Sequence, residues 1–196
     1  MVFRTKDPRR YDIDVLTERP NLAAHIGKIA HLWTLVDIQL GLLLASMLRA
    51  DARSATVMYL KLRGARPHAM DAVAEDILDP SLLSDFRKLM GKVRDIEGSR
   101  NDVIHGLWAI DERDPNNLVW IDTALHLQEA IARRAAMHLP VGPLLVEGSW
   151  WYEAWSSSKD SERIYGESTF IEIEKRVKSL LIQIAEFDGK VMKLFG

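Results

Sequence analysis

Apolar residues recur at alternating steps of three and four along three long stretches of the chain, and no other feature constrains the fold as strongly. This spacing places them on one face of a helix, and such a face is stable only when it is buried. The first stretch predicts a helix over about 21–50, with the apolar positions Leu22, Ile26, Ile29, Trp33, Val36, Leu40, Leu43 and Met47. The last predicts a helix over 169–195, with Phe170, Ile173, Val177, Leu180, Ile184, Phe187, Val191 and Leu194. We expect these two long helices to pair as antiparallel neighbours, the second opened by a capping box at Thr169 and Glu172.

The middle of the chain carries the third stripe and two weaker helical patterns. Glycine and proline breaks bound two shorter predicted helices, over 52–64 and 66–79. Pro80 then opens the third stripe, whose members are Leu82, Phe86, Leu89, Val93, Ile96, Arg100, Val103, Leu107 and Ile110. Arg100 is the one charged residue among them, and a charged side chain on a face that should be buried needs an explanation.

The segment after the third stripe has the pattern of a β-hairpin. Residues 107–125 read as two short strands around a turn with the sequence Asp-Pro-Asn-Asn, at 114–117. The predicted fold class is all-α: a helical bundle that forms a single domain over 1–196, with a small hairpin and loop segment inserted over 111–167. A chain of 196 residues is long enough to bury a core of this kind without disulfides or metals.

Composition excludes several classes of function. The chain has no cysteine, which excludes disulfides, thiolate metal sites and thiol nucleophiles. A formal net charge of -2 argues against broad adhesion to nucleic acid and leaves room for a small local site. The charged N-terminus lacks a signal-peptide pattern, and no run approaches the ~20 uninterrupted apolar residues of a membrane span. We therefore expect a cytoplasmic protein that does not cross a membrane.

The stretch EGSRNDVIHGLWAI, residues 97–110, concentrates the residues with chemical potential. A continuous helix would turn the Arg100 guanidinium toward the core, which is unfavourable unless the charge is paired, by Asp37 or by a bound phosphate. Alternatively, Gly98 ends one helix and Ser99 caps the next. Arg100 would then lie in a first turn, where backbone amides favour an anion.

The polar residues after Arg100 have the spacing of one helical face. Asn101, His105 and Trp108 follow one another at steps of four and three, so the Asn101 amide can orient the imidazole. Arg100 and His105 are about 140° apart on an ideal helix, which makes one copy an awkward catalytic pair. Two copies related by a twofold axis would bring both arginines and both histidines into one cleft, and we therefore expect a homodimer.

The motif at residues 100–106 consists of arginine, asparagine, three further residues, histidine and glycine. It resembles the motif of the HEPN superfamily, many of whose members are metal-independent ribonucleases. The resemblance covers roughly 22–110 and 169–195. It implies that Arg100 holds the scissile phosphate and that His105 exchanges a proton with the ribose 2'-hydroxyl or the leaving 5'-oxygen, giving a cyclic 2',3'-phosphate. Asn101 and Asp37 would support them, and no metal or cofactor would be needed. The implied partners are a second copy, an RNA substrate and an antitoxin-like protein, as in toxin or host-defence systems.

Other readings of the same residues stay open. The arginine–histidine spacing also occurs elsewhere in the chain, but only at Arg100 and His105 is it combined with the asparagine, the apolar stripe and the glycine. Arg100 and Asp37 alternatively form a structural ion pair while His105 packs between helices, in a non-catalytic HEPN-like interaction or nucleotide-binding module. The tryptophan-rich segment 148–155 either stacks on bases or covers the bundle. No metal-ligand motif is present.

Overall fold

The computed structural model describes residues 9–10, 14–111, 114–121 and 163–195. They belong to two compact units. The sheet unit comprises Met1–Ala24 and Asn101–Phe170, and the helical unit comprises His25–Arg100 and Ile171–Gly196. The border between them falls between Arg100 and Asn101.

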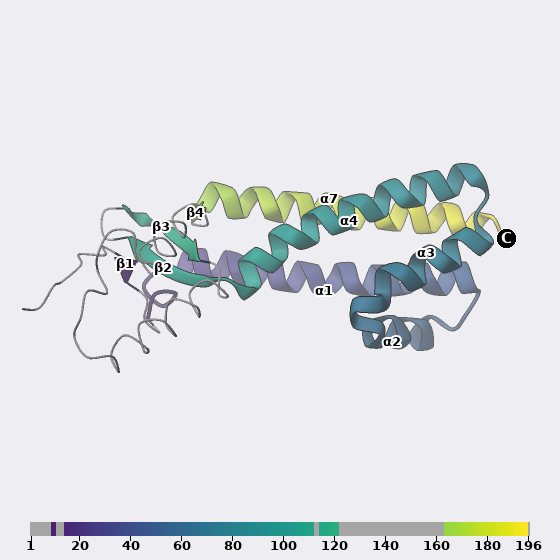
Figure 1. The fold of residues 1–196 in the computed structure, drawn as a ribbon, viewed down its shortest axis with the longest axis horizontal. Helices are drawn as coiled ribbons and strands as arrows, with labels where there is room; N and C mark the ends of the chain where they lie inside the picture. The colour runs from purple at the N-terminus through teal and green to yellow at the C-terminus, as the bar shows by residue number, and fades with distance from the viewer. Residues whose placement is uncertain (1–8, 11–13, 112–113, 122–162, 196) are drawn as a thin grey trace, which may run out of the picture. The chain divides into compact units, whose positions relative to one another are not determined.

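The described chain is mostly helical and carries one small antiparallel sheet (Figure 1). Its helices are α1 (Pro20–Leu48), α2 (Ala52–Leu62), the 3-10 turn η1 (Arg63–Ala65), α3 (Arg66–Ile77), α4 (Pro80–His105) and α7 (Glu167–Lys193). Its strands are β1 (Arg9–Arg10), β2 (Leu107–Asp111), β3 (Asp114–Ile121) and β4 (Arg163–Tyr165). The predicted helical character is confirmed, and the sheet is larger than the single hairpin that the sequence predicts.

Short polar side chains set the starts of two helices. The Asp51 carboxylate accepts a hydrogen bond from the Ser54 amide at 2.8 Å, which caps α2. Asp79 accepts from the amides of Ser81 and Leu82 at 2.8 and 3.0 Å, which caps α4. These caps satisfy backbone donors that a helix leaves without an internal partner.

The start of α7 differs from the prediction. The helix begins at Glu167, two residues before Thr169, so the predicted capping box at Thr169 and Glu172 is wrong. The Thr169 amide donates instead to the Gly166 carbonyl at 3.1 Å, which places Thr169 inside the first turn.

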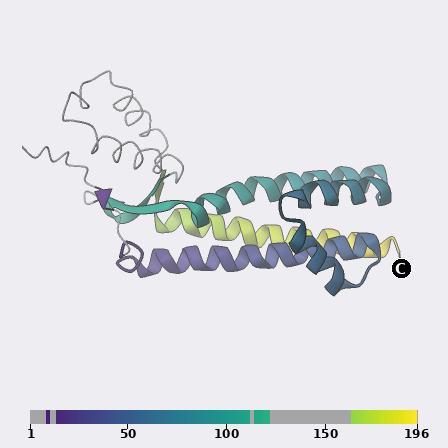
Figure 2. The ribbon, with the colours of Figure 1, turned by 60° about the horizontal axis from the view of Figure 1, so that its bottom comes forward.

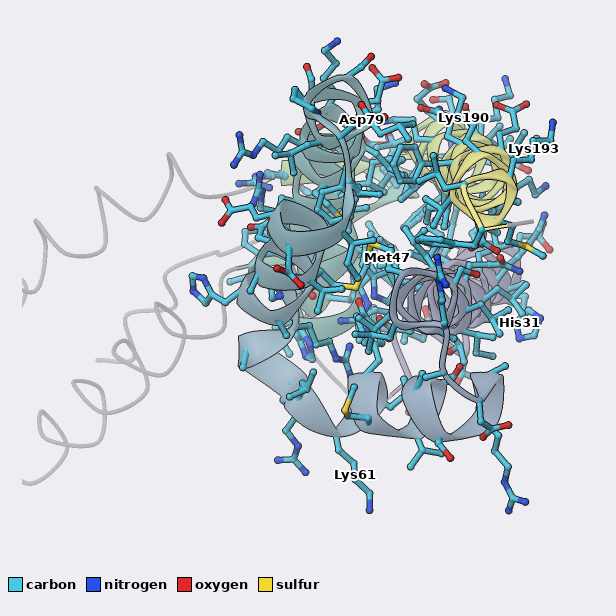
Figure 3. The ribbon with its side chains drawn as sticks, turned by 90° about the vertical axis from the view of Figure 1, so that its right-hand side faces the viewer. His31, Met47, Lys61, Asp79, Lys190 and Lys193 are labelled. Atoms are coloured by element: carbon cyan, nitrogen blue, oxygen red, sulfur yellow. The ribbon has the colours of Figure 1, made fainter. Side chains whose placement is uncertain are left out.

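The three long helices lie side by side in the helical unit, as the views in Figures 1 and 2 agree. Their apolar stripes form its core, as predicted. Fully buried members include Ile29, Val36, Leu40, Leu43, Met47, Phe86, Val177, Leu180 and Ile184. Seen from the end of the unit, Met47 lies among the helices while Lys61 and Lys193 point outward (Figure 3).

The long helices α1 and α7 run in the same direction, so the predicted antiparallel pairing is wrong. His25 near the start of α1 contacts Glu174 near the start of α7. Arg49, just after α1, lies 4.0 Å from the centroid of the Phe195 ring, just after α7. The reason is that a third long helix, α4, lies between them along the chain and runs antiparallel to α7. Asp95 of α4 pairs with Arg176 of α7, whereas the earlier Asp85 pairs with the later Lys190. An up-down-up order makes the first and third helices parallel.

Among the described residues, α1 is the one helix whose length and composition would allow it to cross a membrane. Polar residues interrupt its apolar run, which is why the sequence alone does not predict a membrane span there. Half of its most apolar 18-residue window is buried within the protein. The buried residues of α1 include the stripe positions from Ile29 to Met47, together with Leu32, Leu44 and Ala45.

The sheet has the strand order β1-β2-β3-β4, with antiparallel neighbours throughout. Trp108 pairs with Trp120 across β2 and β3, which confirms the predicted hairpin. The register then shifts, and Asp111 pairs with Asp114. The predicted turn at 114–117 is wrong because these residues belong to β3.

A buried carboxylate joins α1 to α7 in the helical unit. Glu174 is only 4% exposed; its Oε1 lies 2.6 Å from His25 Nδ1 and its Oε2 lies 2.5 Å from Lys28 Nζ. Burial favours the neutral acid, but the hydrogen bonds and charges of Lys28 and His25 outweigh it and lower the pKa of Glu174.

We predict that this carboxylate gives the protein an acid-sensitive stability. Because the folded pKa of Glu174 lies below its ordinary value of 4.5, its contribution is fully present above pH 4.5 and is lost as the pH falls through the lower, folded value. Glu174→Gln should lower the free energy of unfolding at pH 7 by roughly 1–3 kcal/mol and flatten its fall in acid, measured by urea denaturation from pH 7 to 3. Glu172→Gln, at an exposed position of the same helix, is the control and should leave the curve unchanged. Equal curves for the two variants would contradict the prediction.

Candidate functional site

The helix α4 runs without a break through the polar stretch and ends at His105. Gly98 and Ser99 are helical, so the alternative in which Ser99 caps a new helix is wrong. No helix begins at Arg100, and an anion site built from free backbone amides there is excluded. Arg100, Asn101 and His105 therefore belong to one continuous helix.

Arg100 continues the apolar stripe of α4 and is half-buried, as the continuous-helix interpretation predicts. Its guanidinium carbon lies 5.9 Å from the ring centroid of Trp33, which is 4% exposed, and its Nε atom is buried. A guanidinium near an indole face gains a cation–π attraction that partly replaces lost hydration. Arg100 can therefore occupy a position of the apolar stripe because its charge lies near the Trp33 ring of α1.

Asp37 is the residue that the sequence proposes as a partner of Arg100. The structure gives it a hydrogen bond to another residue, Arg66, whose Nη1 lies 3.0 Å from Asp37 Oδ1. Arg100 acts on the same carboxylate through its charge. Burial raises the pKa of Asp37 above its usual range, and the charges of Arg66 and then Arg100, together with the Arg66 hydrogen bond, oppose that rise.

Arg66 is the residue of this cluster that sequence reasoning missed. Besides Asp37, it binds the end of α2: Nε donates to the Tyr59 carbonyl at 3.1 Å and Nη2 donates to the Leu60 carbonyl at 2.9 Å. The last carbonyls of a helix have no partner within the helix, so a cation that binds them is stabilising. No local pattern marks Arg66, because its role depends on a carboxylate 29 residues earlier.

Tyr59 is buried beside the Arg66 guanidinium. The guanidinium carbon of Arg66 lies 5.0 Å from its ring centroid. Burial, and then the negative charges of Asp37 and Glu97, raise the pKa of Tyr59 far above its usual value, while Arg66 opposes this. Its hydroxyl therefore stays protonated at physiological pH.

The residues after Arg100 belong to the sheet unit. Asn101 and His105 are exposed, and His105 is the last residue of α4. Trp108 does not share their helical face, because it lies in β2 and is buried against Tyr165 and Phe170 at centroid distances of 5.2 and 5.7 Å. The predicted face of three residues is therefore reduced to Asn101 and His105.

The glycine after the histidine has a packing role. A Cβ at Gly106 would overlap Trp120 Nε1, at a separation that no side chain tolerates. That indole nitrogen donates to the Asp102 carbonyl at 2.5 Å, and the Gly106 amide donates to the same carbonyl at 3.1 Å. Asp102 also forms an ion pair with Arg163, whose guanidinium lies 5.0 Å from the Trp120 ring centroid. Close approach of Trp120 therefore explains the glycine without reference to catalysis.

Other candidates contribute less. Among the described residues, no three histidine, aspartate or glutamate side chains lie close enough to hold a metal ion. A groove of about 800 Å³ in the sheet unit is lined at the starts of α1 and α7 and by part of β3. Its charged residues, Glu18, Arg19 and Glu167, are of both signs, so it has no clear preference for an anion or a cation. The tryptophan-rich segment 148–155 lies outside the described residues.

Comparisons with models of protein families, with curated proteins and with solved structures found no match to the chain. The resemblance to HEPN proteins therefore depends on the residues from Arg100 to Gly106 and on the helical pattern around them.

We predict that Gly106→Ala destabilises the protein by roughly 1–3 kcal/mol, because the new methyl group overlaps the Trp120 indole. Gly98→Ala, within α4, is the control, since a Cβ at that position would have nothing within 4 Å. It should be neutral or stabilise by about 0.5–1 kcal/mol, as alanine for glycine does in a helix. Thermal and urea unfolding measure both changes, and equal stabilities for the two variants would rule out the close approach.

Proposed function

We propose that the protein is a metal-independent endoribonuclease of the HEPN type, acting in the cytoplasm as a toxin or host-defence enzyme. The observation that carries the proposal is the course of α4, which remains helical from Pro80 through the motif and ends at His105. A half-buried arginine and an exposed terminal histidine are thus presented by one helix. Functional groups on a helix are held more firmly than groups on a loop.

The proposed reaction needs one cation and proton transfer at two oxygens. The 2'-hydroxyl loses its proton and attacks the adjacent phosphorus, the bond from phosphorus to the 5'-oxygen breaks, and that oxygen gains a proton. The products are a 2',3'-cyclic phosphate and a free 5'-hydroxyl. His105 accepts or donates these protons, since an imidazole ring can act both as a general base and as a general acid. Arg100 binds the phosphate oxygens and stabilises the charge that develops on them.

Supporting roles fall to Asp37 and Asn101. The Asp37 charge acts on Arg100, and the Trp33 ring centroid lies 5.9 Å from the same guanidinium. Asn101, one turn before His105 on α4, orients the imidazole. A homodimer brings both arginines and both histidines to one cleft, so that the arginine of one copy acts together with the histidine of the other. No metal is required for either step, and an antitoxin-like protein partner would restrain the activity.

The test compares purified wild-type protein with His105→Ala and Arg100→Gln on single-stranded RNA in EDTA. Each substitution should reduce cleavage by roughly 10²- to 10⁴-fold, because each removes one proton-transfer or charge-stabilising group. Product analysis should find the 2',3'-cyclic phosphate. The folded fraction, checked by circular dichroism, must match that of the wild type. Cleavage that survives His105→Ala, or that EDTA abolishes, contradicts the proposal.

A mixing experiment tests the dimer. Equal amounts of the inactive His105→Ala and Arg100→Gln proteins, unfolded together and refolded, form heterodimers that retain one intact arginine and one intact histidine. If the two copies share a cleft, the mixture should regain about a quarter of the wild-type activity, because half of the dimers are mixed and each has one working pair. A mixture as inactive as its components would show that the site does not combine residues of two copies.

A second candidate is a non-catalytic HEPN-like module that binds a nucleotide or a partner protein. It is favoured by the surroundings of Arg100, since Trp33, Asp37 and Arg66 suit a structural cation as well as a catalytic one. In this case Arg100→Gln would lower the stability of the protein while neither variant changed any RNA cleavage.

A further inference from the structure

Three hydrogen bonds hold the Arg66 guanidinium in the helical unit. Its guanidinium has five N–H donors, and three of its nitrogens bond acceptors on two different helices: Asp37 of α1 and the carbonyls of Tyr59 and Leu60 of α2. The planar group cannot rotate without breaking several of these bonds at once. Arg66 is therefore poorly suited to bind a substrate itself and well suited to fix the position of Asp37.

Asp37 is in turn surrounded by groups from three other elements. Arg66 faces it from α3, Arg100 from α4 and Tyr59 from α2, and Glu97 of α4 acts on Tyr59. The Asp37 side chain is 20% exposed, so these charges act on it through a medium less screening than bulk water. Two arginines and two carboxylates make the cluster formally neutral, and Asp37 is the carboxylate on which both arginines act.

We propose that Arg66 is a positioning residue for Arg100: it holds the Asp37 carboxylate in place one turn of α1 after Trp33, and that carboxylate keeps the Arg100 guanidinium beside the Trp33 ring. The part of this inference that concerns RNA rests on the proposed function; the coupling among Arg66, Asp37 and Arg100 does not. Arg66 itself touches no substrate. Its effect on phosphate chemistry passes through Asp37.

The first test measures the coupling without any substrate. In ¹⁵N-labelled protein the Nε–H resonance of Arg100 is followed against pH, where it reports the titration of Asp37. In Arg66→Gln the carboxylate loses the largest of the charges that lower its pKa, together with a hydrogen bond, so the midpoint should move to higher pH. Arg66→Lys keeps the charge but loses the planar fork, and its midpoint should lie between the two.

The matched control is Arg87→Gln, which removes an arginine–carboxylate pair of the same unit at a site away from the cluster. Arg87 Nη2 lies 2.6 Å from Glu75 Oε1, with both side chains more than half exposed. Its midpoint should equal that of the wild type. An Arg66→Gln midpoint equal to that of the wild type, or a control that shifts as much, overturns the inference. If Arg66→Gln does not fold, Arg66→Lys decides by the same criterion.

The second test uses RNA cleavage. Arg66→Gln should lower kcat by roughly 10- to 100-fold with KM within twofold, because Arg100 keeps its charge for binding but loses its placement for the transition state. The acidic limb of its pH–rate profile should move to higher pH, in step with the resonance. A fall in kcat that merely follows the folded fraction, with an unmoved limb, overturns the positioning role. If the wild type does not cleave RNA, the proposed function fails, and the resonance midpoints alone decide whether Arg66 positions Arg100.

Discussion

The carboxylate of Asp37 is the charge on which the polar part of the helical unit depends. A half-buried carboxylate is unfavourable unless cations or donors replace its lost water. Arg66 supplies a hydrogen bond at 3.0 Å, and the same guanidinium binds the end of α2. This half-buried charge thereby links α1 to Arg66 of α3 and through it to the end of α2, and it interacts with the charge of Arg100. Without it, two arginines would face an apolar core with no counter-charge from α1.

A structural role and a catalytic role for Arg100 are compatible. Enzymes gain most from charges that are already in place before the reaction, because no free energy is then spent on moving them. The Trp33 ring and the Asp37 charge restrain Arg100 in the way that such preorganisation needs. The same restraint would serve a purely structural ion cluster. Only the catalytic role requires Arg100 to bind an RNA phosphate. Measurements of RNA cleavage therefore distinguish the two roles, whereas measurements of stability alone do not.

The sequence predicts what local periodicity determines and misses what depends on distant partners. The helices α1 and α7 begin and end within two residues of their predicted bounds, because a period of 3.6 residues decides which side chains are buried. The third predicted stripe extends too far, since its last two members, Leu107 and Ile110, lie in β2. The direction of α7 relative to α1 carries no such local signal. The Asp37–Arg66 bond spans 29 residues and is equally invisible. Residues 114–117 begin β3, where Asp114 pairs with Asp111, so tertiary pairing prevailed over the turn preference of this sequence.

Gly106 is part of the motif but has a structural explanation of its own. It strengthens the likeness to HEPN proteins, yet Trp120 requires a glycine there on steric grounds alone. The same contact has a consequence for His105. Trp120 Nε1 and the Gly106 amide share the Asp102 carbonyl, so the last turn of α4 is held by a residue of β3. The helix therefore ends at a defined residue, and that residue is the histidine. Packing of Trp120 thus sets the position at which the imidazole is presented. Gly106 is explained by that packing, so only Arg100 and His105 remain as evidence for chemistry at the motif.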